Sequence, residues 1–317
     1  MDWITGMQSA IDYIEDHITE ELDYDAIAAK GFSSGYHFQR IFSLLCGMTL
    51  GEYIRNRRLS LAGAELAAGK IRVIDAALKY GYESPDSFAK AFHKFHGISP
   101  SAARMNGSSL KSFSRLTLKI SLEGGSLMDY RIEEKKEMIL TGFKTHFTGA
   151  PYGKEREAQE EELFVTTRGK QWLLSGAASA DNKDAHCVMA NITDEGYDYY
   201  YCHLLDDYER EHLHDYSVTG MDMEDLGLEN IVLPKATYII FEAKDAQNTI
   251  HELFDLLGRR VRILTEWMPE MGFALARAPE LVVYHWMPRE ERKVEVWMPV
   301  EKAAGCQSIS QRQSQVK

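Results

Sequence analysis

Apolar residues recur at intervals of three and four positions through the first part of the chain, which is the spacing of amphipathic helices. This pattern predicts helices over residues 3–18, 24–30, 35–45, 74–80 and 85–95, each with one apolar face. Residues 50–68 are rich in leucine and alanine and predict one longer helix. The first part of the chain is therefore expected to be all-α.

Two copies of a helix-turn-helix are expected within this part, because the sequence repeats at an offset of fifty residues. Gly31-Phe32-Ser33-Ser34 corresponds to Gly81-Tyr82-Glu83-Ser84, and aromatic, basic and glycine positions further on keep the same register. We expect both glycines to end a helix in the left-handed conformation, and Ser34 and Ser84 to cap the next helix. The long helix between the copies would hold them at a fixed separation.

Beyond residue 107 the spacing changes to the two-residue alternation of strands. Extended segments are expected around 132 and at 138–147, 197–205, 237–243, 281–286 and 293–300, and helices at 155–174 and 248–265. This mixture predicts an α+β domain. Turn-rich stretches suggest a helical domain over 1–107, a linker over 108–126, a second domain over 127–302 and a loose tail over 303–317.

The formal charge of −12 is unevenly distributed along the 317 residues. Residues 1–29 contain eight acidic and no basic side chains, whereas residues 30–107 contain eleven lysines and arginines against five acidic residues. The remaining residues are again acidic. A compact basic segment inside an acidic protein indicates a nucleic-acid-binding module.

The rest of the composition excludes several classes. The four cysteines are scattered without a CxxC pair, which fits reduced thiols in a cytoplasm and gives no thiolate zinc site. The chain has no basic and apolar leader and no apolar run that could cross a bilayer, so we expect a cytoplasmic protein without a membrane partner. Nucleophile-elbow, P-loop and dinucleotide motifs are absent, and no cofactor is expected. His203, Glu209, His212 and His214 match no defined metal motif, and a solvated surface is expected there.

The paired helix-turn-helix resembles the AraC/XylS transcription regulators. The likeness is carried by Leu22-x4-Ile27-Ala28, by Tyr80-Gly81-Tyr82, and by the run from Phe92 to Pro100. Residues 129–301 resemble, less strictly, the GyrI-like effector-binding domain of Rob-type regulators, through residues 233–238, 266–269, 279–284 and 294–300. Together the resemblances imply a multi-domain protein, with an all-α double helix-turn-helix DNA-binding domain followed by an α+β domain of duplicated strand-helix-strand-strand units.

The first recognition helix is expected to read sequence. Its apolar stripe faces inward and leaves an exposed polar side made of Tyr36, His37, Gln39, Arg40 and Ser43. Gln39 suits adenine and Arg40 suits guanine in the major groove. The family resemblance places Tyr36, Gln39 and Arg40 at base-facing positions.

The second recognition helix offers Asp86, Ser87, Lys90 and Lys94, and we expect it mostly to position the protein on DNA. Arg55, Arg57 and Arg58 on the intervening helix are candidates for phosphate contacts; the alternative is a solvated basic face. The expected partner is double-stranded promoter DNA, bound at two major-groove faces roughly 34 Å apart by one chain, with dimerisation left open.

The second domain is rich in aromatic residues and offers a candidate effector site. Strand alternation places Glu295 and Trp297 on one face, and a buried carboxylate walled by aromatic rings attracts lipophilic cations. The GyrI-like resemblance implies a pocket with a glutamate at its floor, a role that we assign to Glu295, with Glu280 as the competing position. The candidate lining residues are Trp297, Tyr284, Trp267, Tyr238 and Trp286. The alternative is that the tryptophans are ordinary core and Glu295 an edge-strand charge.

Three functions follow from these features. The first is a transcription regulator whose second domain senses a small amphipathic or cationic ligand and biases recruitment of RNA polymerase. The second is a GyrI-like hydrolase in which Glu295 with Tyr284 or Tyr238 activates water. The third is a protein-interaction module that mimics DNA or docks a partner such as gyrase. The fused DNA-binding half favours the first.

Overall fold

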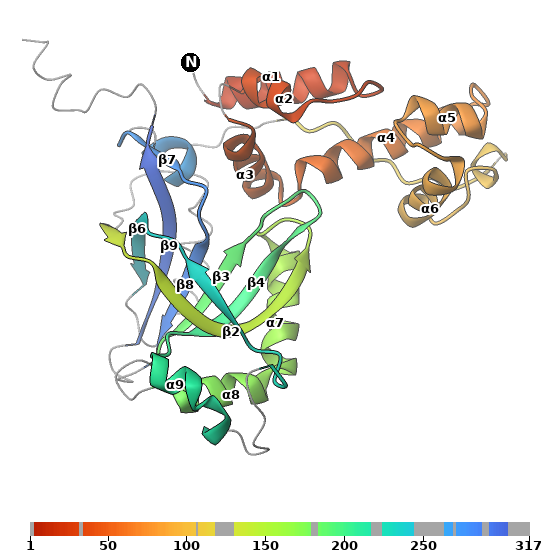
Figure 1. Cartoon of the computed structure of the whole chain (residues 1–317). Helices are drawn as coiled ribbons and strands as arrows, with labels where there is room; N and C mark the ends of the chain where they lie inside the picture. The colour runs from red at the N-terminus through yellow and green to blue at the C-terminus, as the bar shows by residue number, and fades with distance from the viewer. Residues whose placement is uncertain are drawn as a thin grey trace, which may run out of the picture. The chain divides into compact units, whose positions relative to one another are not determined.

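The computed structural model describes residues 3–31, 34–105, 107–117, 130–178, 183–216, 224–243, 263–268, 271–286 and 292–303. The chain divides into two compact units, residues 1–123 and 124–317 (Figure 1). The first is helical and the second is built on an antiparallel sheet, which confirms the fold class expected from the sequence.

The helical unit contains the elements that the apolar spacing predicted. They are α1 (Trp3–Asp16), α2 (Tyr24–Lys30), α3 (Gly35–Cys46), α4 (Leu50–Ala67), α5 (Val73–Lys79), α6 (Pro85–His96) and the short 3-10 turn η1 (Ala102–Arg104). Ser34 and Ser84 cap α3 and α6 as expected, each accepting a hydrogen bond from a backbone N–H three residues on. Gly47 and Gly97 end the same two helices in the left-handed conformation, so the two copies share their stop signals as well as their caps.

The two glycines expected to end the preceding helices differ. Gly81 has a φ of +79° and follows α5, as predicted. Gly31 has a φ of −83°, so the left-handed stop predicted there is wrong. A Cβ on Gly31 would lie 2.9 Å from the Phe38 ring, and Gly31 also lies close to Gly6. The first copy therefore uses its glycine for close packing between helices, a requirement that arises only in the folded chain.

Helix α4 joins the cores of the two copies. Its Tyr53 packs against Phe42 of α3, with ring centroids 5.7 Å apart. Towards its other end, Leu59, Ala62 and Leu66 belong to the buried cluster that contains Phe88 and Phe92 of α6. Each recognition helix is thus fixed to one end of a single continuous helix, as the length of the predicted helix implied.

Residues 108–117, expected to be linker, lie against the helical unit. The backbone N–H of Phe113 donates to the Ser60 hydroxyl at 2.9 Å, and that of Lys111 donates to Nδ1 of His96 at 3.2 Å. His96 uses its other ring nitrogen, Nε2–H, to donate to the Leu59 carbonyl at 3.0 Å. The segment therefore packs along α4 as part of the helical unit.

The second unit is an α+β domain. Its elements are β1 (Tyr130–Lys135), β2 (Met138–Thr148), α7 (Lys154–Thr166), α8 (Arg168–Ala177), β3 (Ala185–Ala190), β4 (Gly196–His203), α9 (Asp207–Glu211), η2 (Leu213–Tyr216), β5 (Glu229–Leu233), β6 (Ala236–Ala243), the π-helical turn η3 (Ile263–Trp267), β7 (Phe273–Leu275), β8 (Glu280–His285) and β9 (Lys293–Lys302). The single helix predicted over 155–174 is divided at Thr167, and β3, β5 and β7 were not predicted. Most of the helix predicted over 248–265 lies outside the described residues.

The sheet contains a structural duplication. Its strand order is β1-β6-β9-β8-β3-β4-β2-β5, with β7 beside β9. The first half runs β2, α7 with α8, β3, β4, and the second half repeats the strands as β6, β8, β9. Strands β3 and β8 join the halves, while β1 pairs with β6 and β5 pairs with β2. The two outer strands are therefore exchanged: β1 precedes the first half in sequence but pairs with the second half, and β5 precedes the second half but pairs with the first.

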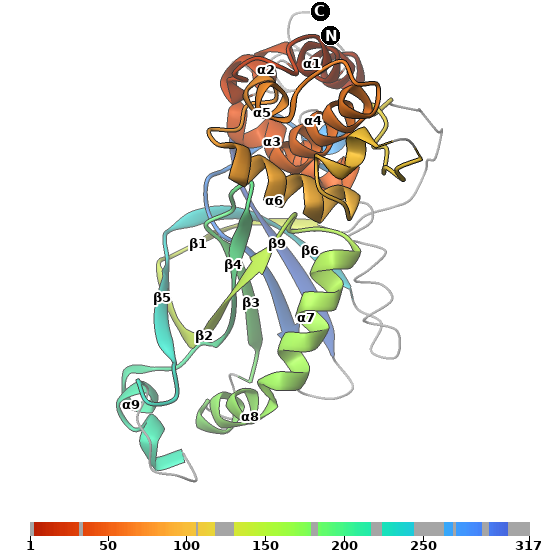
Figure 2. The ribbon, with the colours of Figure 1, turned by 90° about the vertical axis from the view of Figure 1, so that its right-hand side faces the viewer.

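The two faces of the sheet have different neighbours. One face is covered by α7 and α8 (Figure 2), where Phe164 of α7 packs edge-on against Tyr201. The opposite face carries a buried apolar cluster, which we call the inner-face cluster, comprising Leu140, Val188, Tyr200, Cys202, Leu233, Tyr238, Ile240, Leu281, Val283 and Trp297. Every strand except β1 and β7 contributes at least one of these residues. From β5, Leu233 belongs to the cluster and Ile231 packs against it.

Candidate functional site

The first recognition helix, α3, buries the face that its sequence predicted. Phe38, Ile41 and Phe42 are buried, while Tyr36, His37 and Gln39 are partly exposed. Arg40 differs from the expectation of an exposed base-reading side chain, because only 2% of it is exposed. Since the apolar stripe occupies the inward side of α3, Arg40 lies on the other side of the helix. Contact of Arg40 with a base requires that its guanidinium be uncovered.

The second recognition helix, α6, is open on its polar side. Asp86, Ser87, Lys90 and Lys94 are all exposed, as the alternation with Phe88 and Phe92 predicts. The Ser87 hydroxyl donates to the Ser84 carbonyl at 2.8 Å, so part of its hydrogen-bonding capacity serves the helix start. Two lysines on one exposed helix face are suited to phosphate contacts.

The arginines of α4 divide into two groups. Arg55 is exposed, which leaves it open to solvent or phosphate. Arg57 is not: its Nη2 lies 2.6 Å from Glu15 Oε2, its Nη1 donates to the Phe113 carbonyl at 2.5 Å, and its side chain is 12% exposed. Arg58 donates to the carbonyls of Ile18 and Glu20. Arg57 and Arg58 are therefore not available for the phosphate contacts for which they were candidates, because both bind neighbouring segments and hold α4 against them.

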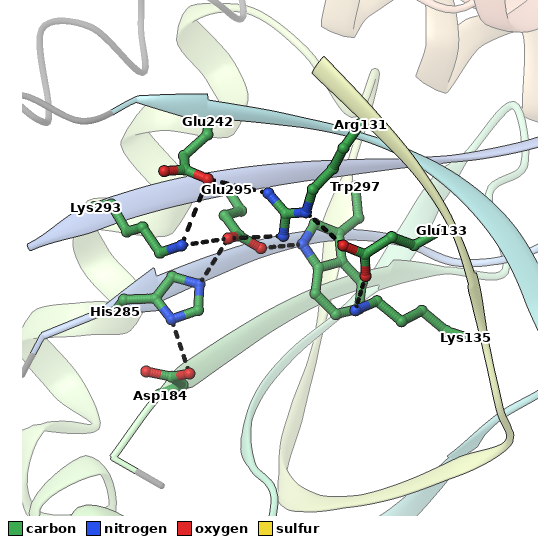
Figure 3. Close-up of polar contacts among 9 residues, drawn as sticks. All are labelled: Arg131, Glu133, Lys135, Asp184, Glu242, His285, Lys293, Glu295 and Trp297. Atoms are coloured by element: carbon green, nitrogen blue, oxygen red, sulfur yellow. Dashed lines mark hydrogen bonds and ion pairs between the residues drawn. The ribbon is translucent and has the colours of Figure 1, made fainter. Parts of the chain in front are cut away.

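On the inner face of the sheet, Glu295 is the centre of a polar group. Its side chain is 2% exposed. Oε1 lies 2.9 Å from Arg131 Nη2 and 3.0 Å from Lys293 Nζ, and His285 Nε2 forms a longer ion pair with it at 3.4 Å (Figure 3). Oε2 accepts from Trp297 Nε1 at 2.8 Å. The carboxylate is therefore buried and fully occupied.

Each of these cations also has a second carboxylate within reach. Arg131 lies 2.6 Å from Glu133 and 3.0 Å from Glu242, and Lys293 lies 3.4 Å from Glu242. His285 Nδ1 lies 2.8 Å from Asp184 (Figure 3). We call these residues, with Glu295, the Glu295 cluster: Arg131, Glu133, Asp184, Glu242, His285, Lys293 and Glu295. They come from β1, β6, β8, β9 and the residue before β3.

The cluster changes the protonation of its members. Burial alone would raise the pKa of Glu295, but the hydrogen bonds from His285, Lys293, Trp297 and Arg131 outweigh it and hold that pKa well below its usual range. Burial opposes the charged form of His285, yet the carboxylates of Asp184 and Glu295 raise its pKa to about 9. At neutral pH Glu295 is ionised and His285 carries a positive charge.

Aromatic rings border the cluster on the same face. Trp297 and Tyr238 lie with ring centroids 5.7 Å apart, and both are nearly fully buried. Lys135 Nζ lies 4.5 Å from the centre of the Trp297 ring. Three of the six predicted effector residues, Glu295, Trp297 and Tyr238, are thus brought together.

The other three predicted residues lie elsewhere. Tyr284 pairs with Val294 rather than with Glu295, and so its side chain lies on the face that α7 and α8 cover. Trp286 stacks on Tyr284 at 5.3 Å, and Trp267 packs against Tyr130 and Phe241. Tyr284, Trp286 and Trp267 are therefore not brought to Glu295, and Tyr284 is not placed to activate water with that carboxylate.

Glu280, the competing carboxylate, is also on the covered face. It is 1% exposed and accepts from the Tyr152 hydroxyl at 3.2 Å. The strand register places Glu280 on this face: Glu295 pairs with Val283 of β8, and Glu280, three positions before Val283, points to the opposite face.

Sequence reasoning missed most of the Glu295 cluster. Lys293 could have been found, because it precedes Glu295 by two positions on one strand. Arg131, Asp184, Glu242 and His285 come from four other segments, and only the strand register brings them together. Among the described residues no group of three or more side chains is arranged to hold a metal ion. Within the same residues, no helix combines the length and apolar character needed to cross a membrane.

The chain is similar to known proteins in its helical part. Residues 27–106 match the helix-turn-helix domain family model. The transcriptional activator AarP of Providencia stuartii is 41% identical over 109 residues, which are 34% of this chain and 81% of AarP. The regulatory protein SoxS of Salmonella typhimurium is 38% identical over 98 residues, 31% of this chain and 92% of SoxS.

A solved structure aligns with a larger share of the chain but less closely. The structure of SAV2435 bound to tetraphenylphosphonium is 16% identical, covers 55% of this chain and 94% of that chain, and has a TM-score of 0.37.

Proposed function

The chain belongs to the AraC/XylS family of DNA-binding transcription regulators, and from that premise we propose that α3 and α6 contact promoter DNA while the sheet domain senses a small molecule. The observation that carries the DNA-binding part is the duplicated helix-turn-helix, with matched caps and stops, held at the two ends of α4. Such a scaffold presents two helices to successive major-groove faces from one chain.

The residues of the two helices take different roles in this proposal. Gln39 reads bases in the first groove, flanked by Tyr36 and His37, and Arg40 joins it once its guanidinium, which is 2% exposed in this structure, is uncovered on binding DNA. Asp86, Ser87, Lys90 and Lys94 place the second helix on the backbone, because exposed lysines contribute charge without a fixed fork geometry. Arg55 adds a phosphate contact.

Selection of bound DNA sequences, followed by binding measurements at several salt concentrations, tests this assignment. Arg40→Ala is expected to lose roughly 1–3 kcal/mol of specific binding and to relax preference at one base pair. Arg55→Ala should weaken binding to all sequences and lower the salt dependence by about one counterion. Arg168→Ala, an exposed arginine of α8, is the matched control and should change neither. An unaltered sequence preference in Arg40→Ala would contradict the base-reading role.

The sensing part of the proposal is supported by the inner face of the sheet domain. There a buried carboxylate accepts a hydrogen bond from Trp297, whose ring packs near Tyr238, and both rings belong to an apolar cluster to which both halves of the duplicated sheet contribute. We infer a GyrI-like effector-binding role for this face, with an amphipathic ligand whose aromatic part packs on Trp297 and Tyr238 and whose polar part meets Glu295. The liganded regulator then alters recruitment of RNA polymerase.

Tryptophan fluorescence of the full chain provides the test. Saturable quenching by aromatic cations is expected, with a corresponding change in DNA affinity or transcription from the selected promoter. Trp297→Phe should remove most of the fluorescence change while retaining binding, because the ring that reports the ligand is lost. Tyr208→Phe, which alters an exposed ring of α9, is the control. Absence of saturable binding by every aromatic cation tried would contradict the sensing role and leave the DNA-binding role intact.

A further inference from the structure

Arg131 occupies the position on Glu295 that a cationic effector would need. We propose that Arg131 determines the specificity of the effector site: its guanidinium is an internal substitute for the ligand, and the effector is an aromatic compound bearing an N–H cation, such as an amidinium, that displaces it. This inference rests on the effector-binding function proposed above and adds the chemical class of the ligand.

The geometry of Glu295 sets what a ligand must replace. Arg131 Nη2 donates to Oε1 at 2.9 Å, while Oε2 is already bonded to the indole of Trp297 at 2.8 Å. The carboxylate is buried, and so loss of Arg131 without a substitute would remove one of the charges that stabilise Oε1, which would keep only Lys293 at 3.0 Å and the more distant His285. A ligand that supplies an N–H donor can replace the guanidinium. A quaternary phosphonium or ammonium has no donor and cannot do so.

Arg131 is able to leave because its other contacts remain. Its guanidinium also contacts Glu133 at 2.6 Å and Glu242 at 3.0 Å, and its side chain is 36% exposed whereas that of Glu295 is 2% exposed. A modest rotation toward solvent would give up Glu295 while retaining both other carboxylates. Displacement therefore leaves no buried arginine without a partner.

The remaining two cations on Glu295 are less suited to this exchange. His285 is held between Asp184 and Glu295, with 19% of its side chain exposed, and Lys293 lies on the same strand as Glu295. Arg131 alone comes from β1, a strand that pairs only with β6 among the described residues. The aromatic body of the ligand would then lie along Trp297 and Tyr238, beside the vacated position.

Binding of two probes to the full chain tests the inference: benzamidine, an aromatic amidinium, and tetraphenylphosphonium, an aromatic cation without N–H donors. For the wild type we expect benzamidine to bind at least tenfold more tightly than tetraphenylphosphonium. Arg131→Ala removes the competing cation and should bind tetraphenylphosphonium at least tenfold more tightly than the wild type does. Arg131→Lys retains a charge and should resemble the wild type. Glu295→Gln should weaken benzamidine binding in either background.

Two controls keep the outcomes distinct. Lys235→Ala removes a positive charge at the same sheet edge, where Lys235 pairs with Glu134 on the surface, and should leave both affinities unchanged. Circular dichroism and thermal unfolding establish that each variant is folded. Unchanged or weaker tetraphenylphosphonium binding in Arg131→Ala, with benzamidine still bound by the wild type, overturns the role of Arg131 and leaves the effector site standing. Failure of all variants to bind either probe overturns both.

Discussion

The helix α6 and the Glu295 cluster handle charge in opposite ways. On α6 the charged side chains are exposed, and all of them come from the same helix at spacings of about one helical turn. In the Glu295 cluster the central charge is buried, and its partners come from segments between residues 131 and 295. A DNA-binding face must keep its charges available for phosphate, whereas a buried carboxylate is tolerated only with partners around it.

The difference explains why the two regions respond differently to substitution. A change on an exposed helix face alters what the protein binds and leaves the fold nearly unchanged. A substitution in the sheet domain lowers the stability of the fold, because it disturbs strand register and packing between residues that are far apart in sequence. Four substitutions or conditions test this contrast.

The largest effect is expected from Gly142→Ala in β2. A Cβ at this position would lie 2.0 Å from the Tyr201 carbonyl oxygen and 2.6 Å from the Cys202 sulfur, so the β2–β4 pair must separate. We expect a loss of about 3 kcal/mol or more in sheet-domain stability, at the upper end for overpacked sites. Urea unfolding of the full chain measures this. Gly176→Ala on α8, where a Cβ meets nothing within 4 Å, is the matched control and should be close to neutral.

Arg57→Ala should separate the structural arginine from the exposed arginine on one helix. It removes the main partner of Glu15, which keeps the hydrogen bond from the Tyr53 hydroxyl at 2.7 Å, and we expect a loss of about 2 kcal/mol in helical-unit stability. Arg55→Ala is expected to cost less than about 0.5 kcal/mol because Arg55 is exposed. Chemical denaturation of both variants checks the ranking; equal losses would show that Arg57 is not the structural residue inferred from its contacts.

Substitution of Gly31 and of Gly81 should destabilise the helical unit for different reasons. Gly81→Ala places an ordinary residue at a φ of +79° and its Cβ 2.7 Å from Arg58 Nη1, and should cost about 1 kcal/mol or more; because the long Arg58 side chain can shift, Gly81→Asn should recover the part of that loss that comes from the backbone conformation. Gly31→Asn should not recover stability relative to Gly31→Ala, because the obstacle is the Phe38 ring at 2.9 Å. Thermal melting of the four variants provides the comparison, and recovery by asparagine at position 31 would indicate strain in φ instead of close packing.

The fourth test varies pH, because the charge on His285 changes within an accessible range. Because Asp184 and Glu295 raise the pKa of His285 from 6.5 to about 9, the unfolded chain loses this proton at lower pH than the folded chain does. The stabilisation is complete below pH 6.5 and is lost as pH rises through about 9. Urea midpoints of the sheet domain should fall over this range, and His285→Gln should flatten the change. An identical slope in that variant would assign the dependence to other groups.

The predictability of the fold follows the same division. Helices α2, α3, α4 and α6 were predicted to within one residue at their ends, because caps, stops and apolar spacing act over a few positions. The strands with alternating apolar residues, β2, β6, β8 and β9, were predicted as well. Strands β3, β5 and β7 were not predicted, nor was the break at Thr167.

By itself, the sequence determined the duplicated helix-turn-helix, the exposed polar face of α6 and the placement of Glu295 and Trp297 on one strand face. These features depend on neighbours within one or two turns or on strand alternation, and so the local pattern contains them. Only the tertiary structure decided that Arg57 supports α4, that Gly31 is a packing site, and that Arg131, His285 and Asp184 surround Glu295. Those contacts join segments up to 164 positions apart, as between Arg131 and Glu295, and no local spacing specifies the register that brings them together.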